Sequence, residues 1–336
     1  MGFFDGLKRD TKQARTVEEV DRPQTQEQEV VVAEEELVDD PENIEVVVRE
    51  VEDYAAPAIP QEPLKSYKDK APVRHVVGQT KIIAIINQKG GVGKSTTAIN
   101  LGAALGEMGK QVLLVDLDPQ GNTTSGLGVE KNEVENTVYE LLLEECELND
   151  CMIKLEVENL SLIPSNVNLA GAEIELIGVE NKEFILKNSI DKIREQYDFI
   201  IIDCPPSLNM LTINAMTTAN TVLVPIQCEY YALEGLTQLM HTIDLVQERL
   251  NPDLEIEGVV FTMYDARTNL SLQVVENVKN NLNQNIYKTI IPRNVRLAEA
   301  PSYGLPITLY DKKSAGAESY RLLAEEVIHR GDEGWQ

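Results

Sequence analysis

Short apolar runs of strand length alternate with segments of helical periodicity from residue 81 onward. The runs are KIIAIIN, QVLLVDLD, LSLIP, FIIIDCP, TVLVPIQ, IEGVVFTMY and YKTIIP. Near-continuous valine, isoleucine and leucine are typical of strands buried on both faces of a parallel sheet. Between the runs, helices are expected at Ser95–Met108, Asn181–Gln196, Ala232–Leu250 and Leu270–Leu282. Repeated strand–helix units predict an α/β fold, a doubly wound, mostly parallel sheet with helices on both faces.

The first 80 residues have a different composition. Twelve acidic residues and one basic residue lie between Glu27 and Asp53, and four prolines follow before residue 73. Such a segment has too little apolar surface to offset the entropy of ordering, so residues 16–78 are predicted to be a disordered acidic linker. Residues 1–15 place two phenylalanines beside lysines, which fits either a frayed terminus or a short amphipathic helix on a membrane or a partner.

These segments leave residues 79–330 as one folded domain, followed by a polar tail at 331–336. The whole chain has 56 acidic and 30 basic residues, a net charge of −26, which argues against a surface coated in basic residues for nucleic acid. No apolar run is long enough to span a membrane, and no secretory signal pattern opens the chain. The four cysteines form no C-x-x-C pair. A cytoplasmic protein without a zinc or iron–sulfur site is expected.

A glycine-rich segment follows the first apolar run, with the sequence QKGGVGKSTT at residues 88–97. Its glycines allow backbone N–H groups to turn inward around an anion, and the following helix adds its positive dipole end. Lys94 is placed for the β- and γ-phosphates of a nucleotide, and the Ser95 hydroxyl for Mg²⁺. The usual motif has glycine six residues before this lysine, where this chain has Gln88, and a second lysine, Lys89, precedes the glycine pair. A nucleotide site is predicted.

Aspartates leave the ends of two further apolar runs. Asp116 and Asp118 end QVLLVDLD, and Asp203 ends YDFIIID. An aspartate at the end of an apolar strand near a phosphate loop commonly holds Mg²⁺. Asp116 and Asp203 are alternatively helix caps or turn formers. Asp118 is a candidate for orienting an attacking water near the γ-phosphate.

At these residues the chain resembles the deviant Walker A ATPases of the ParA/Soj/MinD group, and in particular the Soj-type chromosome-partitioning ParA proteins. The nucleotide motifs are KGGVGKST at 89–96, DLDPQGNTT at 116–124 and DCPPSL at 203–208. The segments at 227–236, 262–274 and 291–307 look specifically Soj-like. The resemblance covers about residues 81–330, so it implies a P-loop NTPase fold for the domain and nothing for the extension.

The resemblance implies ATP and Mg²⁺ as cofactors. Lys89 would be the signature lysine, reaching across an ATP-sandwich dimer to the partner's phosphates, and would act in catalysis with Lys94 and Asp118. Ser95 and Asp203 would hold the metal. The implied nucleotide contacts are Lys89, Gly90, Gly91, Val92, Gly93, Lys94, Ser95 and Thr96 around the phosphates, with Pro292 and Asn294 beside the adenine.

The resemblance also implies that the homodimer binds DNA without sequence preference when ATP is bound, through Arg267 and Arg296. A ParB-type centromere-binding protein would be its partner, and the protein would associate with the nucleoid. From the residues alone, both arginines are better interpreted as ordinary solvated or salt-bridged surface side chains. Nothing in their spacing suggests reading of bases, so phosphate contact is the expected mode.

Two alternatives to a DNA-partitioning ATPase remain at this stage. A MinD-like membrane-positioning ATPase usually ends in a basic amphipathic helix, whereas this chain ends in the polar HRGDEGWQ, so membrane contact is left to residues 1–15. A non-enzymatic scaffold acting through the extension is the second alternative.

Overall fold

The computed structural model describes residues 79–330 except 230–231 and 282–285. The amphipathic helix expected at 1–15, the linker at 16–78 and the tail at 331–336 lie outside the described residues.

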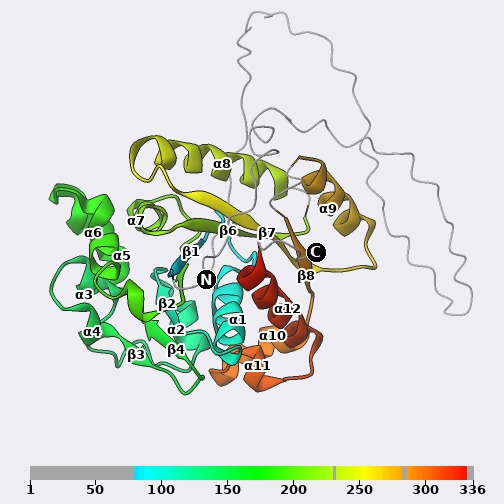
Figure 1. The fold of residues 1–336 in the computed structure, drawn as a ribbon, viewed down its shortest axis with the longest axis horizontal. Helices are drawn as coiled ribbons and strands as arrows, with labels where there is room; N and C mark the ends of the chain where they lie inside the picture. Colours follow the sequence, from blue (N-terminus) through cyan, green and yellow to red (C-terminus); the bar gives the residue numbers. More distant parts are fainter. Residues whose placement is uncertain (1–78, 230–231, 282–285, 331–336) are drawn as a thin grey trace, which may run out of the picture. The chain divides into compact units, whose positions relative to one another are not determined.

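The centre of the described domain is an eight-stranded sheet with the strand order β3-β4-β2-β5-β1-β6-β7-β8 (Figure 1). All neighbouring strands pair in parallel except β3 and β4, which are antiparallel. The strands are β1 (Lys81–Ile85), β2 (Val112–Asp116), β3 (Ile153–Lys154), β4 (Leu160–Ile163), β5 (Phe199–Asp203), β6 (Thr221–Gln227), β7 (Glu255–Tyr264) and β8 (Ile286–Pro292). The predicted doubly wound, mostly parallel sheet is confirmed.

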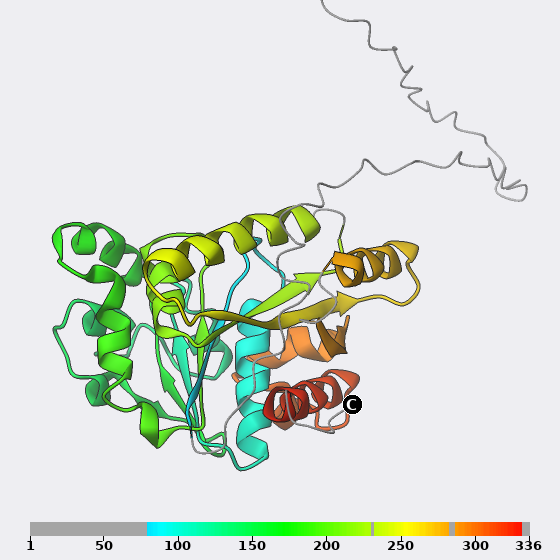
Figure 2. The same ribbon diagram turned by 45° about the horizontal axis from the view of Figure 1, so that its top comes forward.

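Helices cover both faces of this sheet. The α-helices are α1 (Lys94–Glu107), α2 (Asn122–Gly126), α3 (Val138–Leu142), α4 (Leu148–Cys151), α5 (Leu169–Glu175), α6 (Ile185–Ile190), α7 (Met210–Thr218), α8 (Ala232–Arg249), α9 (Asn269–Asn281), α10 (Val295–Glu299), α11 (Ile307–Tyr310) and α12 (Ala315–His329). Within the described residues, four short 3-10 helices complete the connections: η2 (Leu176–Gly178), η3 (Lys182–Phe184), η4 (Arg194–Gln196) and η5 (Ala300–Tyr303). In Figure 2 the cyan α1 and red α12 lie on one side of the sheet, and the yellow α8 lies on the other.

Two hydrophobic clusters form the core, one on each face of the sheet. On β1, Ile82 and Ala84 belong to one cluster, while Ile83 and Ile85 belong to the other. This split follows from the two-residue period of a strand, and it explains why the strand sequences show no polar alternation. Side chains of α3 to α9 belong to the first cluster, and side chains of α1, α10, α11 and α12 belong to the second.

The predicted helix over residues 181–196 is wrong, because the segment is broken into η3, α6 and η4. Asn214 of α7 takes over hydrogen bonds at this break. Its Oδ1 accepts from the Leu186 N–H at 3.2 Å, and its Nδ2 donates to the Lys182 carbonyl at 2.9 Å. A side chain from another element thereby satisfies backbone groups that a continuous helix would pair internally.

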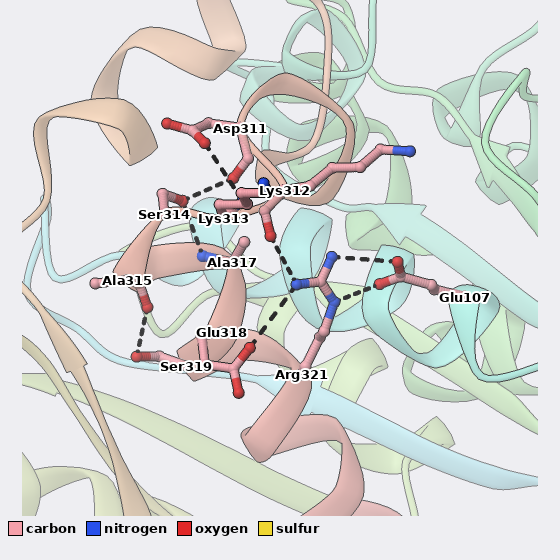
Figure 3. A network of polar contacts seen from close by, with 10 residues as sticks. All are labelled: Glu107, Asp311, Lys312, Lys313, Ser314, Ala315, Ala317, Glu318, Ser319 and Arg321. Carbon is pink, nitrogen blue, oxygen red and sulfur yellow. Dashed lines mark hydrogen bonds and ion pairs between the residues drawn. The ribbon is translucent and has the colours of Figure 1, made fainter.

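Arg321 links the packed helices α1 and α12 (Figure 3). Its Nε and Nη2 donate to the two carboxylate oxygens of Glu107 at 2.8 and 3.2 Å, and its Nη1 donates to the Lys312 carbonyl at 2.9 Å. The fork of the guanidinium thus fixes the end of α1 against α12 and the turn before it. Among the described residues, no helix combines the length and apolar character that a membrane crossing requires.

Candidate functional site

The glycine-rich loop connects β1 to the start of α1, where the sequence predicts it. Gly91 and Gly93 have φ values of +75° and +92°, a left-handed conformation in which other residues are strained. The 14-residue helix α1 begins directly after Gly93 and carries no acidic residue in its first turn. This combination of turned backbone and unopposed helix N-terminus favours an anion.

A pocket of about 420 Å³ opens over this loop. Its polar lining includes Lys94, Ser95, Thr96 and Asp118, together with the backbone of three loop glycines. The complete lining is Gly90, Gly91, Gly93, Lys94, Ser95, Thr96, Ile99, Asp118, Gln120, Asn122, Ser125, Gly126, Pro206, Met263 and Pro301. The structure therefore brings most of the predicted phosphate-binding residues to one cavity.

Lys94 is the cation of this pocket. Its side chain is only 7% exposed, and its Nζ has a long contact of 3.4 Å to the Lys89 carbonyl. Burial lowers the pKa of Lys94, while the carboxylates of Asp203 and Asp118 raise it. A buried ammonium held by one long hydrogen bond and nearby negative charge is well suited to an anionic ligand.

Two buried aspartates lie side by side at the end of the sheet, since Asp116 of β2 and Asp203 of β5 are register partners. Asp116 Oδ2 accepts from the Thr124 N–H at 2.8 Å and from its hydroxyl at 2.6 Å, and Asp203 Oδ2 accepts from the Thr123 hydroxyl at 2.7 Å. Burial and the charge of Asp203 raise the pKa of Asp116 to about 7. Burial is also the main cause that raises the pKa of Asp203 to about 6, with the charge of Asp118 adding to it.

The second carboxylate oxygen of Asp203, Oδ1, is buried and meets no hydrogen-bond donor within the described part of the chain. A hydrogen bond between the Ser95 hydroxyl and the carboxylate of Asp203 lowers the pKa of Asp203. A carboxylate oxygen and a hydroxyl beside a phosphate loop are the hard oxygen ligands that Mg²⁺ takes. The residues present therefore fit a magnesium ion at this position.

Asp118 lies on the loop after β2 and is 6% exposed. Its Oδ1 accepts from the Gln120 N–H at 2.9 Å, and its backbone carbonyl accepts from the Ser165 hydroxyl at 2.8 Å. These contacts hold the carboxylate at the wall of the pocket.

Two of the predicted nucleotide residues are placed differently from the rest. Lys89 does not line the pocket, because its partly exposed side chain forms an ion pair with Glu229, two residues after the end of β6. Val92 points into the core, 1% exposed, and its carbonyl accepts from the Thr262 hydroxyl of β7 at 2.8 Å. Val92 thus contributes its backbone and its packing, and the contact with Thr262 joins the loop to β7.

A second, more apolar cavity of about 350 Å³ adjoins the first and shares Gly93, Thr96 and Met263 with it. The predicted adenine-side residues Pro292 and Asn294 line this cavity. Three other residues of the wall, Thr262, Met263 and Tyr320, were not predicted as site residues from the sequence. Met263 has a φ of +49°, a conformation uncommon for a non-glycine residue. For Thr262 and Met263, the available signal was that residues 262–274 form one of the resembling segments; Tyr320 lies outside these segments.

The predicted DNA-binding arginines lie just beyond this second cavity. Arg267 follows β7, four residues after Met263, and is 85% exposed. Arg296 is in α10, whose N-cap Asn294 accepts from the Arg296 N–H at 2.8 Å, and it is 54% exposed. Each arginine is therefore connected through a few residues of backbone to the wall of the cavity.

Strand order, glycine loop, buried lysine and paired aspartates together define a P-loop nucleotide-binding protein. A family model described as an AAA domain matches residues 80–256, about half of the chain. The sequence is 59% identical over 251 residues to the sporulation initiation inhibitor protein Soj of Bacillus subtilis (strain 168), covering 75% of this chain and 99% of that protein. It is 52% identical over 250 residues to the chromosome partitioning protein ParA of Myxococcus xanthus, covering 74% of this chain and 88% of that protein. The chain belongs to the Soj/ParA family of chromosome-partitioning P-loop proteins.

Solved structures agree with this fold. A cobyrinic acid a,c-diamide synthase of Mycobacterium smegmatis with bound ADP and magnesium superposes with a TM-score of 0.68 at 38% sequence identity, covering 76% of this chain and 97% of that chain. This structural neighbour is named for a different role from those of the Soj and ParA sequence relatives. The shared fold therefore indicates nucleotide binding but does not determine the biological role, which depends on residues outside the nucleotide site.

Proposed function

We propose that this protein is a DNA-partitioning ATPase, which binds ATP with Mg²⁺, dimerises around the nucleotide, binds DNA without sequence preference as the dimer, and releases it after hydrolysis. It acts in the segregation of chromosomes or plasmids, in the cytoplasm at the nucleoid, with a ParB-type partner that stimulates hydrolysis. The observation that carries the proposal is the buried Lys94, which directly follows a left-handed glycine loop and lies beside Ser95 and near the carboxylate of Asp203.

The pocket residues divide the chemistry among them. Lys94 and the loop backbone neutralise the β- and γ-phosphates, and Ser95 and Asp203 hold the metal. Bound Mg²⁺ would neutralise charge that develops on the phosphate oxygens. Asp118 accepts a hydrogen bond from the attacking water and orients it toward the γ-phosphate. The apolar cavity at Pro292 takes the base, since its lining is mostly carbon.

Exposed apolar side chains at the nucleotide edge of the sheet support dimerisation there. Val167 follows β4 and Leu208 follows β5, so both lie at the carboxyl ends of parallel strands, as the phosphate loop does. Ile174 of α5 and Ile177 of η2 are also exposed, and Asn209, next to Leu208, contacts Glu173 of α5. Apolar residues gathered at a ligand edge favour burial against a second copy. On dimerisation, Lys89 leaves Glu229 and contacts the phosphates of the nucleotide that is bound to the second copy.

The DNA contact rests on Arg267 and Arg296, which are exposed cations on an otherwise acidic protein. Two arginines per protomer give a weak contact with phosphates, and a dimer doubles it, so affinity depends on nucleotide-driven dimerisation.

Measuring steady-state ATP hydrolysis, with and without DNA, tests the enzyme. Lys94→Ala is expected to abolish hydrolysis, and a Lys94→Ala protein with normal turnover would disprove the enzymatic proposal. Lys110→Ala, at a partly exposed lysine just after α1, is the matched control and is expected to retain wild-type turnover.

DNA co-sedimentation with ATP, ADP or no nucleotide, at two salt concentrations, tests the binding. Retention is expected only with ATP and only at low salt, and Arg267→Glu is expected to abolish it. Retention that is equal with all three nucleotide states would contradict the proposed switch. Liposome binding that requires residues 1–15 would instead favour the MinD-like membrane alternative, and function retained by an ATPase-dead variant but lost without residues 1–78 would favour the scaffold.

A further inference from the structure

The side chain of Arg267 is held by a carboxylate two residues earlier in the same loop. Its Nε and Nη2 donate to Asp265 Oδ1 and Oδ2 at 2.8 and 2.7 Å, and its backbone N–H donates to Oδ1 at 3.0 Å. Asp265 is 21% exposed, against 85% for Arg267. The hydrogen bonds from Arg267 keep the pKa of Asp265 well below its usual range. The positive charge of Arg267 is therefore neutralised by Asp265, and the position of its guanidinium is fixed by the same hydrogen bonds.

Arg296 shows the same arrangement in a separate element. Its Nη1 donates to Glu299 at 2.8 Å, and its Nε lies 3.6 Å from a carboxylate oxygen of Asp311, the residue at the turn before α12 that Figure 3 shows. The Tyr310 hydroxyl donates to the same Glu299 oxygen at 3.1 Å and fixes the carboxylate. The loop arginine Arg267 and the helix arginine Arg296 thus each have an acidic partner.

The loop of Asp265 is also joined to the nucleotide cavities. Met263 lines both cavities, and Asp265 lies two residues after it in the chain. The Tyr264 carbonyl between them accepts from the N–H of Arg293, another cavity residue, at 3.0 Å, and the charge of Arg293 also lowers the pKa of Asp265. A shift of the backbone at the cavity wall can therefore move the Asp265 carboxylate, because only two residues of chain separate them.

We propose that Asp265 is a positioning residue that limits the affinity for DNA, because it holds the Arg267 guanidinium in a bidentate pair that a DNA phosphate must displace. This inference rests on the proposed DNA contact of Arg267. A carboxylate and a phosphate accept the same two parallel N–H bonds, so they compete for one fork. A DNA phosphate can replace Asp265 on the Arg267 guanidinium because an exposed ion pair in water is weak. Asp265 thus sets how much affinity each protomer contributes, and a dimer contributes it twice.

The test is the affinity of the full-length protein for a double-stranded DNA fragment of random sequence, with Mg²⁺ and a slowly hydrolysed ATP analogue, by fluorescence anisotropy. Asp265→Asn keeps an oxygen for the Arg267 N–H and removes the charge that holds the guanidinium. It is expected to tighten DNA binding roughly three- to tenfold, the range that loss of a weak exposed pair gives over two protomers. Asp253→Asn is the matched control, because this exposed aspartate precedes β7 at its opposite end; no change is expected.

A double-mutant cycle separates positioning by Asp265 from a general effect of charge. With Arg267→Gln as background, Asp265→Asn is expected to have no further effect. The proposal is overturned if Asp265→Asn leaves affinity unchanged or weaker in a protein whose thermal unfolding matches wild type. Tightening that persists in the Arg267→Gln background, or that Asp253→Asn reproduces, overturns it as well. If Arg267→Gln alone leaves DNA binding unchanged, the proposed DNA contact itself fails, which is a separate result.

Discussion

The buried pair Asp116 and Asp203 should make the nucleotide-free protein less stable as the pH rises. A carboxyl group whose pKa is higher in the folded than in the unfolded state favours folding fully at low pH, and this contribution is lost as the pH rises toward the folded pKa. For Asp116 the pKa rises from 3.8 to about 7. Linkage then gives a loss of about 2 kcal/mol in the free energy of unfolding between about pH 5.5 and pH 8.

Substituting Asp116→Asn removes one member of this pair while keeping an oxygen for the N–H and hydroxyl of Thr124. The variant should lose less than half of the wild-type change over the same pH interval, since both its own titration and its repulsion of Asp203 are gone. Urea unfolding followed by circular dichroism, without metal or nucleotide, measures both proteins at both pH values. Groups elsewhere contribute equally to the two proteins, so the difference isolates the pair. Equal pH dependence in the two proteins would refute the reasoning.

Three further substitutions test the packing of the domain by the same urea unfolding. Glu257→Ala should cost about 3–5 kcal/mol, because Glu257 Oε1 accepts from Lys81 and Tyr287, both at 2.8 Å, and removing it leaves a buried ammonium without its counter-charge; a cost near zero would contradict the buried pair. Gly304→Ala should cost about 1–3 kcal/mol or more, since φ is +66° and a Cβ would lie 2.5 Å from the Gly128 Cα; a neutral effect would mean that the two turns separate freely. Arg321→Ala should cost only about 1 kcal/mol, because its partner Glu107 is partly exposed, and a larger loss would show that the Lys312 carbonyl contact matters more than the ion pair.

The strands and the phosphate loop were predictable because each depends on local pattern. A strand buried on both faces needs a continuous apolar run, and β1, β2, β5, β6 and β7 each have one. The two-residue strand β3 has too little sequence to give a pattern. The break between residues 181 and 196 depends on Asn214, a residue of another helix, and no local periodicity can report that contact.

The candidate site was predictable to a similar degree. Carboxyl ends of parallel strands meet at one edge, so aspartates that end apolar runs were expected near the loop, and Asp118 and Asp203 lie there. The pairings of cations were not predictable. Lys89 with Glu229 and Arg267 with Asp265 depend on side-chain positions that spacing does not specify. The roles of these residues in hydrolysis and DNA binding stay predictions.

The cluster around Glu257 has a consequence for the connectivity of the domain. Lys81 opens β1, Arg330 follows α12, and the Arg330 guanidinium lies 4.2 Å from the centre of the Tyr287 ring, whose hydroxyl donates to Glu257. The two ends of the described domain therefore converge on one carboxylate near the start of β7, far along that strand from Thr262 and Met263 of the cavities. Ends that converge away from the ligand edge are suited to circular permutation, in which a short linker joins them and new ends open in an exposed loop. The first and last described elements of the domain, β1 and α12, therefore bring the two ends of the domain close together.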